Sequence, residues 1–251
     1  MCIRDSLQDM TPEEFTAATA RPIQKIAAFH YFGEPAKAAA ESLGLDGFRF
    51  YFVGRGGVLG DTPADVARSS FGYFEPGVMT KMWNTGKERA DLTQTAKAQL
   101  GVAYALAAEK LGSVDGLANA AIAMSDMADA VDPAGLPLFA GFRSMETPED
   151  PTSAFMHQAI VHRELRGSVY LACCAAMGPS SRAAHQLARP QDLEMFGYRD
   201  MVDVSDEEQA LFEQLEPMTD AAMTRHASTI SADQRSQIAT TVAAAHAALE
   251  E

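Results

Sequence analysis

The sequence predicts a mainly α protein in which two packed helical halves surround a buried central helix, with a degenerate winged-helix-like arrangement as the open variant. Three observations predict this class. Helix-start signals recur along the chain, Ala-rich segments end at single glycines, and the segment 152–178 is too apolar for a surface helix. Only 48–53 is aromatic and β-branched enough for a strand, and its state stays open.

The first half of the chain is expected to cover residues 7–131 and to be helical. A capping-box-like start at Thr11, with Pro12 at the first helical position, predicts a helix to about Phe32, which Pro22 should kink or divide. Further helices are expected over 34–43, from 61 to about 73, briefly after Glu75-Pro76, over 91–111 and over 114–130.

A Pro/Gly-rich connector at 132–151 is the best candidate boundary, and the second half is expected to cover 152–251. The central helix comes first, weaker signals run to residue 198, a capping-box string at Ser205 opens an amphipathic helix, and the last helix is expected over 231–249. Residues 1–6 match the translation of a transposon-type sequencing adapter. We therefore treat them as an artefact of an assembled, metagenomic read, and the true start of the chain is left open.

Charge and hydropathy argue against two classes of partner. The chain has 20 Lys and Arg against 34 Asp and Glu, and its formal charge of −14 opposes any large contact with nucleic acid or an anionic membrane. No run of basic residues marks a local patch that would survive this average. No apolar run approaches the roughly 20 residues of a membrane span.

Cysteine and histidine spacing gives no sign of a metal or a cofactor. Cys173 and Cys174 are neighbours on a predicted helix, where their side chains diverge, so a disulfide between them is not expected. Zinc-type spacings, a phosphate-binding loop and a dinucleotide fingerprint are absent from the sequence. We expect two buried thiols in a reducing, cytoplasmic compartment, with a homodimer as an open possibility.

The candidate site lies on the central helix, which carries ionisable groups in an otherwise apolar segment. Charged groups in a buried helix are costly unless they are paired or used in function. His157 and Glu164 are seven residues apart and are expected to share a face and a pocket. Arg166 and Tyr170 form an i, i+4 pair, and Arg163 lies near Gly167, where another backbone or a ligand could approach.

Arg55 is added to this candidate ligand-binding site because it lies within Gly54-Arg55-Gly56-Gly57. A glycine-rich turn there could present backbone N–H groups to an anion. The competing interpretations are structural: a plain turn with a solvated arginine, and a buried ion-pair network among Arg163, Glu164 and Arg166 that ties the central helix to its neighbours.

Four short strings occur in an order that resembles a known family. They are Tyr31-Phe32, the segment 51–60, Phe74-Glu75-Pro76, and Met156-His157 followed by His162-Arg163-Glu164-Leu165-Arg166-Gly167. In this order, over 23–178, the chain resembles a family of uncharacterised, mostly actinobacterial proteins labelled helix-turn-helix family. The resemblance supports adding Arg55 to the site, and it implies a winged-helix-like fold and a DNA-binding regulator.

The chain departs from the family pattern within the last string. Leu165 stands where the family has a histidine, and Ser168 and Tyr170 replace its aspartate and final histidine. If those groups bind a metal or move a proton in relatives, that capacity is lost or altered in this chain. A winged-helix-like segment is also not recognisable between residues 182 and 205.

Three functions follow as hypotheses. The first is a small-molecule-binding or regulatory module with a site built from Arg55, His157, Glu164 and Arg166. The second is a winged-helix DNA-binding regulator, which the resemblance favours and the net charge opposes. The third is an enzyme that uses His157 or Glu164 as an acid or base, although no second group stands at a recognisable spacing.

Overall fold

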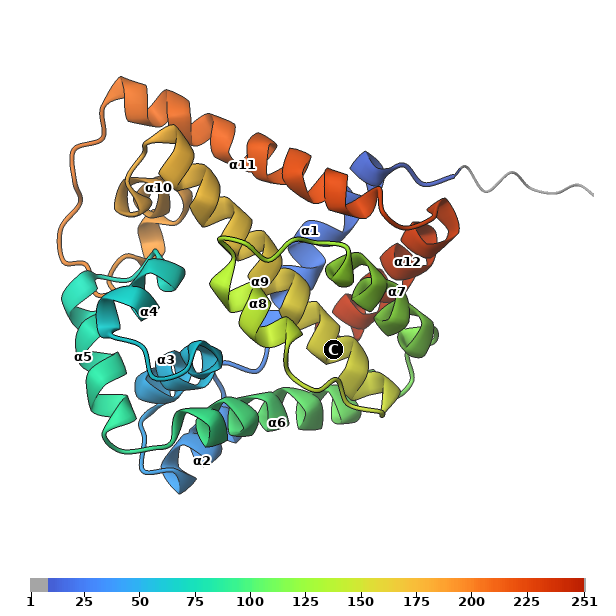
Figure 1. The fold of residues 1–251 in the computed structure, drawn as a ribbon, viewed down its shortest axis with the longest axis horizontal. Helices are drawn as coiled ribbons and strands as arrows, with labels where there is room; N and C mark the ends of the chain where they lie inside the picture. Colours follow the sequence, from blue (N-terminus) through green and yellow to red (C-terminus); the bar gives the residue numbers. More distant parts are fainter. Residues whose placement is uncertain (1–8, 251) are drawn as a thin grey trace, which may run out of the picture.

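The computed structural model describes residues 9–250, and in this range the chain forms α-helices and two short 3-10 helices with no strand (Figure 1). The mainly α class is confirmed. The artefact expected at residues 1–6 lies outside the described residues. The helices are α1 Pro12–Ala28, α2 Glu34–Ser42, α3 Gly47–Gly56, α4 Ala64–Phe71, α5 Pro76–Lys87, α6 Leu92–Leu111, α7 Leu117–Asp129, α8 Pro137–Arg143, α9 Pro151–Met177, α10 Ser181–Ala188, α11 Asp206–Ala227 and α12 Ala232–Glu250, with the 3-10 helices η1 Gly57–Leu59 and η2 Pro190–Asp192.

Local capping sets the start of α1 where the sequence predicts it. The Thr11 side chain accepts a hydrogen bond from the backbone N–H of Glu14 at 3.2 Å, and the Glu14 carboxylate accepts one from the Thr11 N–H at 2.8 Å. This reciprocal pair satisfies two of the backbone donors that a helix start leaves free. The helix then continues through Pro22, because Thr19 and Ile23 on either side are buried against the rest of the fold.

The segment 48–53, which sequence patterns leave open, is helical and belongs to α3. Asp46 caps this helix by accepting a hydrogen bond from the backbone N–H of Arg49 at 2.9 Å. Every residue from Phe50 to Gly56 is buried, because α3 packs against both α5 and α6. A helix that is buried on all sides has no polar face, so its sequence has no helical period to recognise.

The connector at 132–151 is not a plain loop. It contains the short helix α8, which begins with Pro137 at its first position. Leu138, Phe139 and Phe142 on this helix are almost fully buried and face the core around α9. The Pro/Gly-rich connector therefore contains a helix that was not predicted from the sequence, and three large apolar side chains dock it onto the central helix.

The central helix is confirmed as α9, which spans 27 residues from Pro151 to Met177. It runs diagonally through the middle of Figure 1, and it packs against α1, α6, α7, α8 and α11. Sixteen of its residues are buried, including His157, His162 and Glu164. Polar groups on α9 therefore need partners within the protein.

Residues from both sides of the connector share one hydrophobic core. The N-terminal helix α1 packs against α11 and α12 as well as α9, so the two ends of the chain meet in space. A second, aromatic core lies under α3, α4 and α5, with Phe52, Phe71 and Trp83 almost fully buried in it. The division of the chain at 132–151 into two halves stays a prediction.

Candidate functional site

The centre of the candidate site is a buried ion-pair network around Glu164. This residue has no exposed surface. Arg55 from α3 donates to both of its oxygens, with Nε 2.9 Å from Oε1 and Nη2 2.7 Å from Oε2. Arg163 donates from Nη1 to Oε1 at 2.5 Å and to the Tyr31 hydroxyl at 3.2 Å. The network therefore joins α9 to α3 and to the end of α1.

The charges in this network do not balance. Two guanidinium groups, on Arg55 and Arg163, share one carboxylate, which leaves one positive charge in excess inside the protein. Burial acts to raise the pKa of Glu164, but the two arginines outweigh it and hold that pKa below its ordinary value. Burial raises the pKa of Tyr31, which keeps its hydroxyl neutral.

Arg55 reaches Glu164 from the last turn of a helix, and not from a glycine-rich turn. Its guanidinium carbon lies 4.8 Å from the ring centre of Phe71, the last residue of α4. The neighbouring glycines make room for packing: a Cβ on Gly54 would lie 2.8 Å from the Gln99 side chain, and one on Gly56 would lie 2.6 Å from Trp83. The expectation of backbone N–H groups open to an anion is wrong, because side chains from α5 and α6 fill that space.

His157 does not join the network. Its Nδ1 lies 2.8 Å from the Tyr104 hydroxyl of α6, and its ring is 1% exposed. Burial lowers the pKa of His157 to about 4, so the ring is neutral near pH 7. The expectation that His157 and Glu164 share a pocket is wrong, because His157 faces α6 while Glu164 faces α3.

Arg166 and Tyr170 also point elsewhere. Arg166 forms ion pairs with Glu216 and with Asp220 of α11, the latter at 3.0 Å. The predicted Arg166–Tyr170 pair is not formed, and Tyr170 packs near Tyr73 with ring centres 6.0 Å apart. A Cβ on Gly167 would meet nothing within 4 Å, so no backbone approaches it and the expected close contact is wrong. Among the six predicted residues, only Arg55, Arg163 and Glu164 come together.

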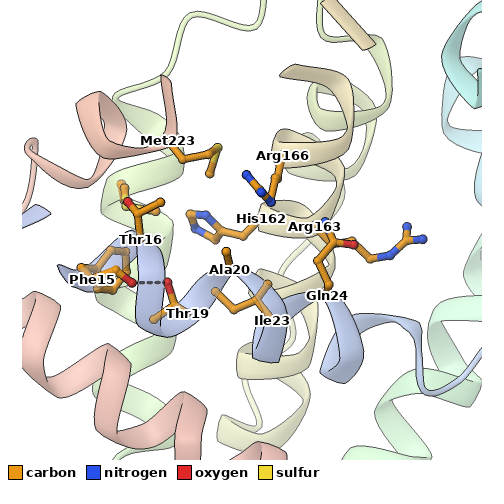
Figure 2. Close-up of a pocket in the computed structure, with 11 residues that line it drawn as sticks. Phe15, Thr16, Thr19, Ala20, Ile23, Gln24, His162, Arg163, Arg166 and Met223 are labelled. Carbon is orange, nitrogen blue, oxygen red and sulfur yellow. Dashed lines mark hydrogen bonds between the residues drawn. The ribbon is translucent and has the colours of Figure 1, made fainter. Parts of the chain in front are cut away.

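A small pocket lies between α1 and α9, with further walls from α7 and α11 (Figure 2). Its volume is about 30 Å³. His162, which was not among the predicted site residues, points into this pocket in Figure 2, while the Arg163 guanidinium points away from it. The pocket is lined by Phe15, Thr16, Thr19, Ala20, Ile23, Gln24, Met127, His162, Arg163, Arg166 and Met223.

One ring nitrogen of His162 lacks a partner. Its Nε2 lies 2.8 Å from the carbonyl oxygen of Met124, so this nitrogen carries the proton and donates it. Its Nδ1 is buried with no hydrogen-bond partner. Burial lowers the pKa of His162 to about 4, and Nδ1 therefore presents a lone pair. His30, His157 and His185 also have a buried ring nitrogen without a partner, and among these rings that of His162 lines the pocket.

Helices α4 and α5 form a helix-turn-helix unit. The turn has four residues, from 72 to 75, and Gly72 adopts a φ of +61°, which L side chains rarely tolerate. Helix α3 packs against α5 (Figure 1), and the three helices share the aromatic core with Tyr31, Leu193, Phe196 and Tyr198. The sequence predicts α4 and α5 separately. The two helices are recognisable as one helix-turn-helix unit only once Gly72 is known to begin the turn between them.

The segment of the chain that contains this unit is less acidic than the protein as a whole. Four exposed residues recur at helical spacing along α5 and define one face, which we call the α5 face: Gly77, Lys81, Asn84 and Glu88. Residues 47–90 hold six basic and four acidic side chains, a net charge of +2, while the whole chain carries −14. One of the six basic groups, Arg55, is buried and paired with Glu164, so it adds nothing to the exposed charge.

No group of three or more His, Cys, Asp or Glu within residues 9–250 could hold a metal ion. In the same range, no helix is both long and apolar enough to cross a membrane. A family model described as "Helix-turn-helix family" matches residues 16–201, about three quarters of the chain. No curated protein and no solved structure matches the chain significantly. The matched range includes the α4–α5 unit and all of α9.

Proposed function

Because the chain belongs to the helix-turn-helix family, we propose that it is a regulatory protein that contacts duplex DNA through the α5 face. The observation that carries this proposal is the α4–α5 pair with its Gly72 turn, set on α3. In DNA-binding units of this kind the second helix enters the major groove and its first turns reach the base edges. Here that helix is α5.

The chemistry of the α5 face suits a short contact. Lys81 is exposed and can neutralise a phosphate or donate to guanine, and Asn84 can form paired hydrogen bonds with adenine. Glu88 closes the face at its far end and discourages contact with the next phosphate. The acidic remainder of the protein repels the duplex, so we expect binding to be confined to this face and weak on unselected DNA.

The enzyme hypothesis has less support. Both oxygens of Glu164 already accept hydrogen bonds from guanidinium groups, so this carboxylate is not free to take a proton from a substrate. The small-molecule hypothesis is supported by a pocket that contains Arg163 and Arg166 from the predicted set and adds His162.

Selection of duplexes from a random pool, followed by fluorescence anisotropy at several salt concentrations, tests the proposal. We expect an enriched sequence that binds more tightly than the starting pool. Lys81→Ala should weaken binding across sequences and lower the salt slope by about 1, while Asn84→Ala should relax one base preference. Lys25→Ala, an exposed lysine on α1 beside α12, is the matched control. Absence of enrichment, or equal loss in Lys81→Ala and Lys25→Ala, would refute the α5 face as the contact.

A further inference from the structure

We propose that the pocket between α1 and α9 binds a small 2-hydroxy carboxylate, with the carboxylate on Arg166 and the adjacent hydroxyl donating to Nδ1 of His162. Three features carry this inference: an unpartnered acceptor, a cation at the same cavity, and an excess of buried positive charge beside it. It does not depend on contact with DNA.

The acceptor is His162. Its Nε2–H is committed to the Met124 carbonyl, which fixes the tautomer and leaves Nδ1 as a lone pair in a ring that is 2% exposed. The Thr16 and Thr19 hydroxyls donate to carbonyls of their own helix, and the other donors in the pocket lining, on Gln24 and Arg166, form no hydrogen bond with this nitrogen. A bare carboxylate would repel this lone pair, so the ligand needs its own hydrogen-bond donor.

The cation is Arg166, whose side chain lines the same pocket and is 13% exposed. Its present partners, Glu216 and Asp220, are 59% and 48% exposed. Ion pairs with carboxylates that remain this solvated contribute little free energy. A ligand carboxylate in the drier pocket can therefore replace one of them.

The neighbouring residue Arg163 adds an electrostatic bias. Its side chain forms part of the pocket wall, and its guanidinium shares Glu164 with Arg55. The Arg163 guanidinium points away from the cavity, so the excess positive charge of that network acts on the pocket through the intervening protein, where little water screens it. The pocket therefore favours an anion over a neutral ligand of the same shape.

Size and lining restrict the ligand further. The cavity volume of about 30 Å³ restricts the ligand to a small acid and excludes a large metabolite. The opposing walls carry Met127 and Met223, whose flexible side chains adapt to the remaining carbon atoms. Glycolate is the smallest compound with both required groups.

Three compounds of nearly equal size test the contributions of the hydroxyl and of the carboxylate charge separately. Glycolate has both groups, acetate lacks the hydroxyl, and glycolamide lacks the charge. Each compound is titrated into protein labelled with carbon-13 at the methionine methyl groups. The signals of Met127 and Met223 then report binding at the pocket that these residues line. We expect glycolate to shift the Met127 and Met223 signals saturably, with an affinity about tenfold higher than that of either control. Equal affinities for the three compounds, or binding that leaves both methyl signals in place, overturns the proposal.

Variants on the pocket rim test the role of Arg166. Glu216→Gln removes an exposed competitor and should tighten glycolate binding a few fold, while Arg166→Gln should weaken it about tenfold. Lys25→Gln alters an exposed ion pair on α1 with Glu250 and should leave binding unchanged. Circular dichroism confirms that each variant is folded. Wild-type affinity in folded Arg166→Gln overturns the assignment.

Discussion

Gly72 in the turn between α4 and α5 lies directly against Leu171 of α9: a Cβ added to Gly72 would lie 2.2 Å from the Leu171 Cδ2 atom. This contact places the turn of the helix-turn-helix unit on the central helix. It also explains why the turn needs glycine twice over, since its φ of +61° disfavours any L side chain.

Gly72→Ala should therefore lower the free energy of unfolding by about 1–2 kcal/mol from the backbone alone, with a further loss as Leu171 moves. Urea denaturation at neutral pH measures this change. Gly101→Ala is the matched control: Gly101 is exposed within α6 and a Cβ there meets nothing within 4 Å. That variant should gain up to about 1 kcal/mol. A neutral Gly72→Ala would show that the turn is looser than the structure indicates.

Glu164→Gln should cost about 3–5 kcal/mol, because it leaves two buried guanidinium groups without a counter-charge. Glu216→Gln breaks a half-exposed pair with Arg166 and should cost less than about 1 kcal/mol. Equilibrium denaturation at constant pH measures both. If the two substitutions cost the same, the network around Glu164 is more solvated than its burial suggests.

Lowering the pH should begin to destabilise the protein at pH values well above the ordinary pKa of carboxylates. Burial lowers the pKa values of four histidines to between about 3 and 4, so the unfolded chain binds protons that the folded chain does not. Their contribution is complete above about pH 6.5 and falls as pH drops toward 4, by on the order of 2 kcal/mol at pH 5 for a fully buried ring. Below pH 4.5, protonation of Glu164 adds a further loss. The histidines are His30, with a pKa of about 3, and His157, His162 and His185, each about 4.

Denaturation curves at pH 7.5, 6 and 5 measure this dependence, and His157→Gln, which removes one of these groups, should reduce its slope. A stability that does not change between pH 7.5 and pH 5 would contradict the assignment of neutral, buried rings.

Cys173 and Cys174 should resist alkylation in the folded protein. Both thiols are buried, and burial raises the pKa of Cys174 to about 11, which suppresses the reactive thiolate. Iodoacetamide labelling followed by peptide mass spectrometry should show modification only after denaturant is added. Rapid labelling of either cysteine under native conditions would indicate that the end of α9 opens.

Helix starts were predictable because they depend on residues a few positions apart. The capping boxes at Thr11 and Ser205 and the glycine after α9 are local signals, and each lies where the structure ends or begins a helix. Helix α3 was not predictable in this way. A helix that is buried on every side lacks the 3.6-residue period of apolar and polar residues by which a surface helix is recognised.

The sequence predicts the concentration of charge on the central helix, and the resemblance adds Arg55 to the site, but the pairing of these groups was not predictable. The sequence indicates that Glu164 needs a cation, and it offers Arg163 beside it, but the strongest partner, Arg55, lies 109 residues away along the chain. That pairing is set by the packing of α3 against the rest of the fold. The same limit hid His162, because a histidine on a buried helix has no sequence mark that separates a satisfied ring from one lacking a donor.

Arg163 belongs at once to the wall of the α1–α9 pocket and to the ion pairs that hold α3. At the other end of those ion pairs, Arg55 lies over Phe71, the residue from which the helix-turn-helix turn departs. Any occupant that shifts Arg163 changes how much of the Glu164 charge is left for Arg55. If a ligand in the pocket changes the affinity of the α4–α5 unit for its own partner in this way, thermodynamic reciprocity requires that partner to change the affinity of the pocket for the ligand by the same factor.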